Sequence, residues 1–328
     1  AAKEVMEAPK ASRAAADTAA EADTEAAASE DAEAADTEAA DAAETTGSGK
    51  VTVYMPSPAG LADKLAEAFT AETGIQVEQI QGTTGEILAR LETEAANPVA
   101  DVVILASWSD GLTMKEDGQI MSYTPANADL VNEGWIDEDS MLFGYSASAV
   151  GVIYNTTIYP ELSADWADLA GADYTDDIAI PDPEKSGACK DFLAGMVTGL
   201  DNGEEIMQSW ADNGLTVPGA NSAALESVTT GEKGILIAGV DYNAYSSMAD
   251  GEPLSIYYPA SGTVVNPRPA MIMNTAPNVD NAKAFIDFLF SDEAQQMVAD
   301  AYLLPGRSDI QCDGRTNLSD IPQIPTDW

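Results

Sequence analysis

Residues 178–189 read IAIPDPEKSGAC, and the elements predicted on either side of this stretch are described relative to it. A β-branched run enters a loop punctuated by prolines, and the apolar series through Phe192 and Met196 predicts a helix that begins at Ser186. Serine is a preferred N-cap, and the first N–H groups of a helix have no partner within it. Gly187 lets another group approach the backbone closely. The stretch therefore predicts either a plain capped helix or an anion site at a helix N-terminus.

Three strand–loop–helix units precede this stretch. Strands are predicted at residues 51–55, 75–80 and 101–105, and the last of them is a continuous apolar run, as buried parallel strands are. Such units predict a parallel sheet, and open α/β sheets bind ligands beyond the carboxyl ends of their strands. The loops at these ends contain Ser57, the run Thr83-Thr84-Gly85 and the pair Ser107-Trp108.

Two extended segments, residues 144–154 and 264–273, flank an inserted α/β block. We predict an α/β protein of two lobes, each a mainly parallel sheet flanked by helices, joined by a two-strand hinge with a ligand cleft between the lobes. The predicted boundaries are residues 51–146 plus 265–310 for lobe 1, residues 147–264 for lobe 2, and residues 311–328 for a C-terminal tail.

Residues 1–50 differ in composition from the rest of the chain. Ala, Glu, Asp and Thr dominate them, and they contain no aromatic residue. Such a segment cannot bury enough apolar surface to offset the entropy of ordering, and it lacks the hydrophobic a and d positions of a coiled coil. We predict a disordered acidic linker that tethers the body to the cell exterior, similar to the spacer of a surface lipoprotein.

The charge of the chain limits its partners. The formal net charge is −42, which argues against nucleic acid or an anionic membrane surface as a partner. This field repels anionic ligands at long range, so an anion site must depend on local donors. The two cysteines, Cys189 and Cys312, would permit a disulfide in an exported protein, and two unreactive thiols fit the sequence as well.

The chain contains no histidine, which removes the Ser–His–Asp and Cys–His arrangements and the usual zinc sites. No other motif pairs a nucleophile with a base. We therefore predict that the protein is not an enzyme and has no catalytic residue, resident metal or cofactor. An enzyme on the same scaffold and a surface adhesion or scaffold protein without a small ligand are the competing classes.

Several segments, in this order and at this spacing, carry a resemblance to a known family. They are the strand–loop–helix at 51–69, TAETGIQVE (70–78), GTTGEILARLETEAANPVADVVI (82–104), GVIYNT (151–156), DPEKSGA (182–188), NSAALESVTTGE (221–232) and NAKAFIDFLFSDEAQQMV (281–298). Together they resemble the extracellular solute-binding proteins of ABC importers, in the branch that contains ferric-ion-, phosphonate- and sugar-phosphate-binding members. The resemblance implies a monomeric, two-lobed type II periplasmic binding protein, extracellular or periplasmic, that closes on a solute and docks on a membrane permease.

The resemblance also offers two ligands. Ferric-binding members hold iron with a His, a Glu and a Tyr pair, positions that fall here at or near Pro58, Ala106 and Val240-Asp241, none of which supplies the group. Ser186-Gly187-Ala188, in contrast, matches the segment that holds a phosphate in that family. We therefore expect a phosphonate or phosphate ester. Ferric iron stays as the alternative, because a slip of one or two residues would bring in Tyr242 or Tyr245.

The predicted ligand-binding residues come from both lobes. Arg268 is expected either to clamp the oxyanion or to form a structural ion pair, and Asp241 either to accept from the ligand or to cap a loop. Trp108, Tyr145 and Tyr242 are expected to be either cleft walls or core. The complete predicted set is Ser57, Thr83, Thr84, Gly85, Ser107, Trp108, Tyr145, Ser186, Gly187, Ala188, Asp241, Tyr242 and Arg268.

Overall fold

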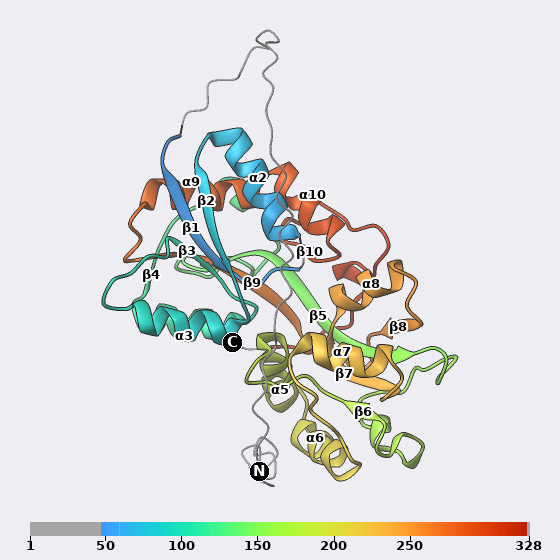
Figure 1. Ribbon diagram of the computed structural model, residues 1–328. Helices are drawn as coiled ribbons and strands as arrows, with labels where there is room; N and C mark the ends of the chain where they lie inside the picture. The colour runs from blue at the N-terminus through green and yellow to red at the C-terminus, as the bar shows by residue number, and fades with distance from the viewer. Residues whose placement is uncertain (1–46, 59, 327–328) are drawn as a thin grey trace, which may run out of the picture. The chain divides into compact units, whose positions relative to one another are not determined.

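The computed structural model describes residues 47–58 and 60–326 (Figure 1). The linker predicted at residues 1–50 therefore lies, except for its last four residues, outside the described residues. Within the described part, no helix is both long enough and apolar enough to cross a lipid bilayer.

A mixed sheet forms the centre of the described chain, with its strands in the order β2-β1-β3-β9-β5-β7-β6. Three further strands join it, because β8 and β10 pair with β5 and β4 pairs with β9. The strands are β1 (Lys50–Met55), β2 (Gln76–Gln81), β3 (Val102–Ile104), β4 (Ile120–Met121), β5 (Phe143–Asn155), β6 (Ile178–Ala179), β7 (Ile235–Val240), β8 (Leu254–Tyr257), β9 (Val265–Met273) and β10 (Leu304–Pro305).

The helices flank this sheet (Figure 1). They are α2 (Leu61–Thr73), α3 (Thr84–Glu94), α4 (Trp108–Glu116), α5 (Gly187–Gly199), α6 (Gly203–Asp212), α7 (Asn221–Thr229), α8 (Asp241–Ala249), α9 (Val279–Leu289) and α10 (Asp292–Asp300). Strand β1 pairs in parallel with β2 and β3, as the strand–loop–helix units predicted.

Strands β5 and β9 are the two extended segments that the sequence predicted, and they divide the sheet into two portions. The half of β5 up to Ala149 pairs with β9, whereas the half from Val150 onward pairs with β7 and β8. Figure 1 shows β5 passing from the region flanked by α2, α9 and α10 to the region of α7 and α8. We call the first region, with β1–β4, β9, β10, α2–α4, α9 and α10, the first portion. The second portion contains β6–β8 and α5–α8.

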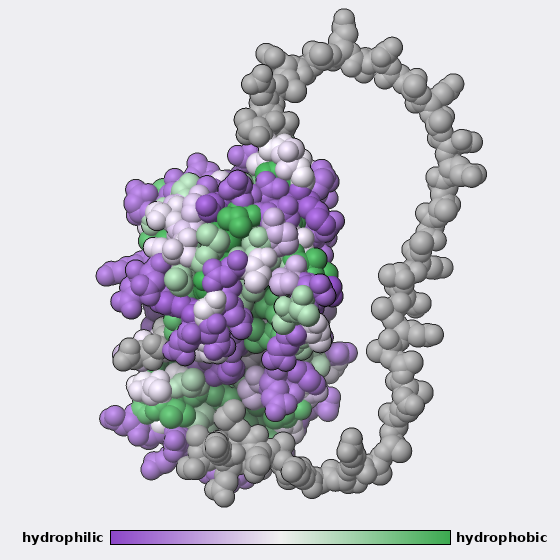
Figure 2. Space-filling view, turned by 90° about the vertical axis from the view of Figure 1, so that its left-hand side faces the viewer, coloured by the Kyte–Doolittle hydropathy of each residue, from purple (hydrophilic) through white to green (hydrophobic). Residues whose placement is uncertain are grey.

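Apolar side chains fill each portion separately. In the first portion, Tyr54, Val103, Trp108 and Leu142 belong to one buried cluster. In the second portion, Ile153, Leu236 and other aliphatic residues form a cluster between the sheet and helices α7 and α8. On the face seen in Figure 2, hydrophilic residues surround separate groups of hydrophobic ones, as the acidic composition leads one to expect.

The described part of the predicted C-terminal tail packs against both portions, because Ile321 clusters with Trp135 and Leu304 whereas Arg315 contacts Asp241 of α8. Thr263 donates its N–H to the Pro322 carbonyl at 2.8 Å, and the Ile324 N–H donates back to Thr263 at 2.8 Å. Ile321 and Ile324 are buried. The segment is therefore a structural part of the body.

Both cysteines are buried free thiols, so the structure favours the second of the two alternatives that the sequence left open. The thiol of Cys189 donates to the Pro181 carbonyl at 3.2 Å, and that of Cys312 donates to the Leu303 carbonyl at 3.0 Å. Burial raises the pKa of Cys312 to about 11 and raises that of Cys189 further.

We expect neither thiol of the folded protein to react with a thiol reagent at pH 8, because the thiolate is the reactive species and both pKa values lie well above that pH. After unfolding, both thiols should react. Counting the modified thiols by mass spectrometry before and after denaturation tests this prediction. Fewer than two reactive thiols in the unfolded, unreduced chain would instead reveal a disulfide.

Candidate functional site

A cavity of about 470 Å³ lies where the loops that follow β1, β2 and β3 meet the second portion. Its lining combines residues that are far apart in the sequence, from Pro56 to Arg268. The lining residues are Pro56, Ser57, Pro58, Gln81, Gly82, Thr83, Thr84, Glu86, Ala106, Lys185, Ser186, Gly187, Ala188, Ala220, Asn221, Ser222, Val240, Tyr242, Asn243 and Arg268.

Four helices begin at this cavity. Helix α3 has Thr83 as its N-cap and α5 has Ser186, and each side-chain oxygen accepts an N–H of its own first turn at 3.2 Å. Helices α7 and α8 begin after Ala220 and Val240, where no side chain caps the helix. The first N–H groups of a helix lack intrahelical partners, and the terminus carries a partial positive charge. The convergence of four such termini makes the cavity electropositive in a strongly acidic protein.

Arg268 of β9 adds a full positive charge to the same cavity. Its side chain is only 2% exposed, its Nη2 donates to the Pro56 carbonyl, and its guanidinium lies 5.7 Å from the centre of the Tyr242 ring. The other arginines in the described part of the chain, Arg90, Arg307 and Arg315, each pair with a carboxylate, but no carboxylate lies within 4.0 Å of Arg268. The structural ion pair considered for Arg268 is therefore not formed among the described residues.

Other polar groups of the lining also lack partners within the described protein. The Nε of Arg268, the hydroxyl of Ser57 and the Oδ1 of Asn221 are buried without a hydrogen bond. Buried polar groups are normally paired, because an unpaired one costs free energy. The lining contains one carboxylate, Glu86, whose Oε2 accepts the Thr83 N–H at 2.7 Å. The arrangement can thus offer many donors and little negative charge to a ligand.

The structure brings together most of the residues that the sequence predicted for the site. Eight of them line the cavity: Ser57, Thr83, Thr84, Ser186, Gly187, Ala188, Tyr242 and Arg268. Gly85 lies beside it in the first turn of α3, where a Cβ would be 3.1 Å from the Glu184 carbonyl.

Ser107 and Trp108 do not line the cavity, which corrects the expectation for the loop after β3. Asp191 of α5 occupies the N-terminus of α4 that these residues form, accepting from the Ser107 hydroxyl at 3.0 Å and from the Trp108 N–H at 2.9 Å. The Trp108 ring is 4% exposed and belongs to the core of the first portion. The protein's own carboxylate therefore takes the place that we expected for a ligand.

Asp241 and Tyr145 are also structural. The Asp241 carboxylate is fully buried, pairs with Arg315 Nη2 at 2.6 Å and accepts from the Tyr258 hydroxyl at 2.9 Å. The Tyr145 side chain is fully buried in β5. Of the three aromatic residues considered as walls, only Tyr242 faces the cavity.

The sequence interpretation missed several lining residues. Asn221 and Ser222 lie in the first turn of α7, and Asn243 lies in the first turn of α8. The segment at 221–232 is one of those that carry the family resemblance, so its start could have been recognised as another helix N-terminus. Helix α8 gives no comparable signal, because its Asp-Tyr-Asn start lacks apolar periodicity.

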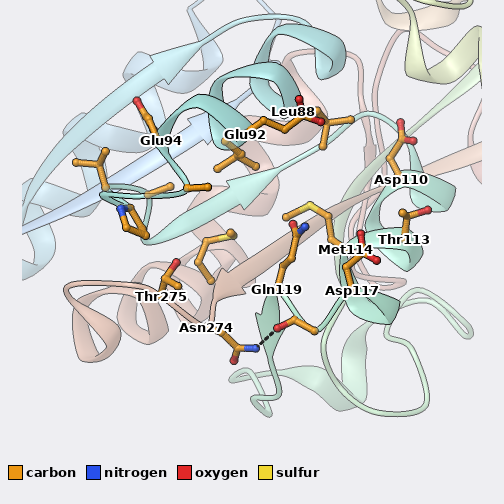
Figure 3. A pocket seen from close by; sticks show the side chains of 17 residues that line it. Leu88, Glu92, Glu94, Asp110, Thr113, Met114, Asp117, Gln119, Asn274 and Thr275 are labelled. Atoms are coloured by element: carbon orange, nitrogen blue, oxygen red, sulfur yellow. Dashed lines mark hydrogen bonds between the residues drawn. The ribbon is translucent and has the colours of Figure 1, made fainter.

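A second cavity of about 520 Å³ has the opposite electrostatic character (Figure 3). The C-caps of α3 and α4, Ala95 and Asp117, line it, and helix C-termini carry partial negative charge. Glu92, Glu94 and Asp110 add carboxylates around Leu88 and Met114 in the view of Figure 3. This cavity therefore does not suit an anion.

The described side chains offer little to a bound metal. Among the described residues, no group of three or more Cys, Asp and Glu side chains is arranged to hold a metal ion, and the chain has no histidine. On the lining of the first cavity, only Glu86 and the phenol of Tyr242 could supply anionic oxygen.

A comparison with protein families identifies the chain. Residues 97–321 match the family model described as bacterial extracellular solute-binding protein. The chain belongs to this family. Its members are binding proteins of transport systems, not enzymes, and this chain is the solute-binding component of an ABC importer. The family also places the protein in the periplasm or outside the cell.

Curated relatives differ in what their names say they bind. The chain is 28% identical over 272 residues to "Iron uptake protein A1" of Synechocystis sp., covering 76% of this chain and 73% of that protein. It is 26% identical over 258 residues to the "Putative 2-aminoethylphosphonate-binding periplasmic protein" of Salmonella typhimurium, covering 74% of this chain and 73% of that protein. Iron and phosphonate are both represented among the relatives.

Solved structures confirm the predicted fold, a two-lobed type II periplasmic binding protein. Iron-bound HitA from Pseudomonas aeruginosa aligns with a TM-score of 0.74 and 21% identity, covering 83% of this chain and 92% of that chain. AfuA from Actinobacillus pleuropneumoniae with bound fructose-6-phosphate aligns with a TM-score of 0.75 and 21% identity, covering 85% and 92%. At this level of identity the likeness shows the fold and not the ligand.

Proposed function

We propose that the first cavity binds a small oxyanion, a phosphonate or a phosphate ester, which the protein delivers to a membrane permease. The observation that carries this proposal is Arg268, buried where four helices begin and without a carboxylate partner among the described residues. A buried charge is stable only when it is paired, and in a chain of net charge −42 an acidic partner would be easy to supply. The missing counter-charge is therefore expected to come from the solute.

A tetrahedral phosphoryl or phosphonyl group suits the distribution of donors. Ser186, Gly187 and Ala188 present a helix N-terminus from the second portion, and Thr83 and Thr84 present one from the first. Such a group has three oxygens that point in different directions, so donors on opposite walls can bind it together. The relative named for 2-aminoethylphosphonate and the structure of AfuA with bound fructose-6-phosphate support this choice.

Ferric iron is the second candidate, favoured by the similarity to iron uptake protein A1. A hard cation requires several anionic oxygen ligands. The lining offers Glu86, already engaged in the N-cap of α3, and Tyr242, which lies against Arg268. These two groups, beside a guanidinium, make a poor cation site, and we therefore rank iron below an oxyanion.

Thermal unfolding of the full chain with added solutes tests the proposal. The panel contains 2-aminoethylphosphonate, fructose 6-phosphate, glycerol 3-phosphate, inorganic phosphate, ferric citrate, citrate and fructose. We expect at least one phosphorus compound to raise the melting temperature, because a ligand of the folded state stabilises it by roughly 4 kcal/mol at a thousandfold excess over Kd. A shift with ferric citrate but not with citrate, or with fructose alone, would refute the oxyanion proposal.

We further propose that the two sheet portions are the two lobes, with residues 51–146 plus 265–310 in lobe 1, residues 147–264 in lobe 2 and residues 311–328 as the tail. The change of strand partners between Ala149 and Val150 and the start of β9 at Val265 support these boundaries. We also propose that the protein is a monomer tethered through residues 1–50, which sedimentation of the isolated chain and membrane fractionation of cells would test.

A further inference from the structure

The carboxylate of Asp191 lies buried at the junction between the two sheet portions. Asp191 belongs to α5 of the second portion and is fully inaccessible to solvent. No function considered above uses this charge. Burial raises the pKa of Asp191, whereas hydrogen bonds from Ser109, Ser107 and Trp108 act in the opposite direction.

Four donors surround this carboxylate, all from the first portion, and three of them come from the start of helix α4 and its N-cap. Oδ1 accepts from the hydroxyls of Ser107 at 3.0 Å and Ser109 at 2.6 Å. Oδ2 accepts from the N–H of Trp108 at 2.9 Å and from Nδ2 of Asn266 on β9 at 3.1 Å. Each oxygen thus receives two hydrogen bonds, which satisfies the group without water.

No lysine or arginine in the described part of the chain lies within 4.0 Å of Asp191. Its charge is opposed by the positive end of α4, whose N-cap is Ser107. The anion at the N-terminus of α4 is therefore a carboxylate from the second portion. Among the described residues, the four helices that begin at the cavity receive no such carboxylate from the opposite portion. This difference indicates that the contact joins the two portions and does not receive a ligand.

Two neighbouring contacts show how closely the portions meet here. Lys190 of α5 pairs with Asp110 of α4 at the edge of the same junction. At the start of α5, a Cβ on Gly187 would lie 2.9 Å from the Ser107 Cβ and 3.1 Å from the Ala106 carbonyl carbon. A backbone contact this close needs the glycine. The N-termini of α4 and α5 are therefore in direct contact.

We propose that Asp191 is an interlobe latch, a carboxylate that binds the N-terminus of α4 and holds the two lobes in the arrangement seen here. Moving α4 away from α5 would remove three of the four donors and leave the carboxylate without most of its hydrogen bonds. The latch shifts the equilibrium between open and closed forms toward closed before a solute binds. It thereby raises the fraction of molecules that are competent to retain the solute.

Distances between two spin labels on the full chain, measured without solute, test the latch. The labels are attached at Glu92→Cys on α3 and Glu205→Cys on α6, exposed positions in the two portions, and the native thiols are buried. Asp191→Asn preserves the size of the side chain but places an NH₂ group against donors. We expect the open-to-closed ratio to rise roughly tenfold, because a charge-assisted hydrogen-bond cluster is lost.

Asp212→Asn is the matched control, because Asp212 is an exposed carboxylate on α6 whose partner, Gln208, lies in the same helix. It should leave the distance distribution of the parent unchanged. Ser109→Ala removes a single donor to Asp191 and should shift the distribution less, in the same direction. Should Asp191→Asn fail to fold, Ser109→Ala decides the question.

An unchanged distribution in both variants would refute the latch, even if their melting temperatures fell, because a purely structural role for Asp191 changes stability without opening the lobes. An added population of longer distances supports it. The measurement contains no solute, so its result does not depend on whether the cavity binds an oxyanion.

Discussion

Replacement of Arg268 by methionine is expected to weaken binding of the phosphorus compound found in the solute panel by about a hundredfold. Loss of one partner from a buried charge pair costs about 2 to 5 kcal/mol, because the remaining charge stays desolvated. In the complex that remaining charge would be the oxyanion of the solute. Titration calorimetry of the full chain measures the change in Kd.

The same substitution should not lower the stability of the ligand-free protein. Arg268 has no carboxylate within 4.0 Å among the described residues, and its Nε has no hydrogen-bond partner. Replacing an uncompensated buried charge with an apolar side chain of similar length is neutral or stabilising. We therefore expect an equal or higher melting temperature without solute, together with weaker binding.

Arg90→Met is the matched control for this pair of measurements. Arg90 also lies over a tyrosine ring, with 5.3 Å from its guanidinium to the Tyr54 ring centre, but it pairs with Glu94 outside the first cavity. Its substitution should leave Kd unchanged. If Arg268→Met instead lowered ligand-free stability and preserved Kd, Arg268 would be a structural residue and the oxyanion proposal would lose its main support.

The second large effect is expected at the ion pair between Arg315 and Asp241. Both side chains are completely buried and their closest atoms are 2.6 Å apart. Arg315 also donates to the Tyr302 carbonyl at 2.6 Å and lies 5.0 Å from the Tyr245 ring centre. The pair therefore ties the C-terminal segment to the start of α8, one of the helices at the cavity.

Arg315→Met should lower the free energy of unfolding by about 3 to 5 kcal/mol, because it leaves the Asp241 carboxylate buried without its counter-charge. Urea denaturation of the full chain, followed by tryptophan fluorescence, measures the loss. The exposed pair between Lys50 and Glu78 is the control, since both side chains are about half exposed. Lys50→Met should cost less than about 1 kcal/mol.

The double variant Arg315→Met with Asp241→Leu separates the loss of the ion pair itself from the cost of leaving the Asp241 carboxylate buried without a counter-charge. Removing both charges should restore part of the stability, because no uncompensated carboxylate remains buried. A loss of less than about 1 kcal/mol in Arg315→Met would show that water reaches Asp241, contrary to its complete burial.

Structural features that depend on residues close together in the chain could be predicted from the sequence. The apolar strands at 51–55 and 101–105 appear as β1 and β3, and the two extended segments appear as β5 and β9. Ser186 caps α5 through the N–H of Cys189, as the local pattern predicted. Such caps and periodicities depend on residues three or four positions apart, so a single sequence contains them completely.

Helix α8 was not predicted, and the helix of the third strand–loop–helix unit, α4, was predicted without bounds, because the local signals of both are weak. Helix α4 reads WSDGLTMKE and α8 reads DYNAYSSMA, and glycine, serine and asparagine have low helix propensity. Both helices are supported by long-range contacts. Asp191 accepts from the first turn of α4, and Arg315 pairs with Asp241 in the first turn of α8.

The sequence by itself determined the fold class, the linear order of most elements and the helix start at Ser186, because each depends on periodicity or capping within a few residues. It could not decide which polar side chains face a ligand. Ser107 and Asp191 are 84 positions apart, and Asp241 and Arg315 are 74 apart. Whether a charge finds its partner inside the protein depends on the packing of distant elements, and only the tertiary structure separated Asp241, which is paired, from Arg268, which has no carboxylate partner among the described residues.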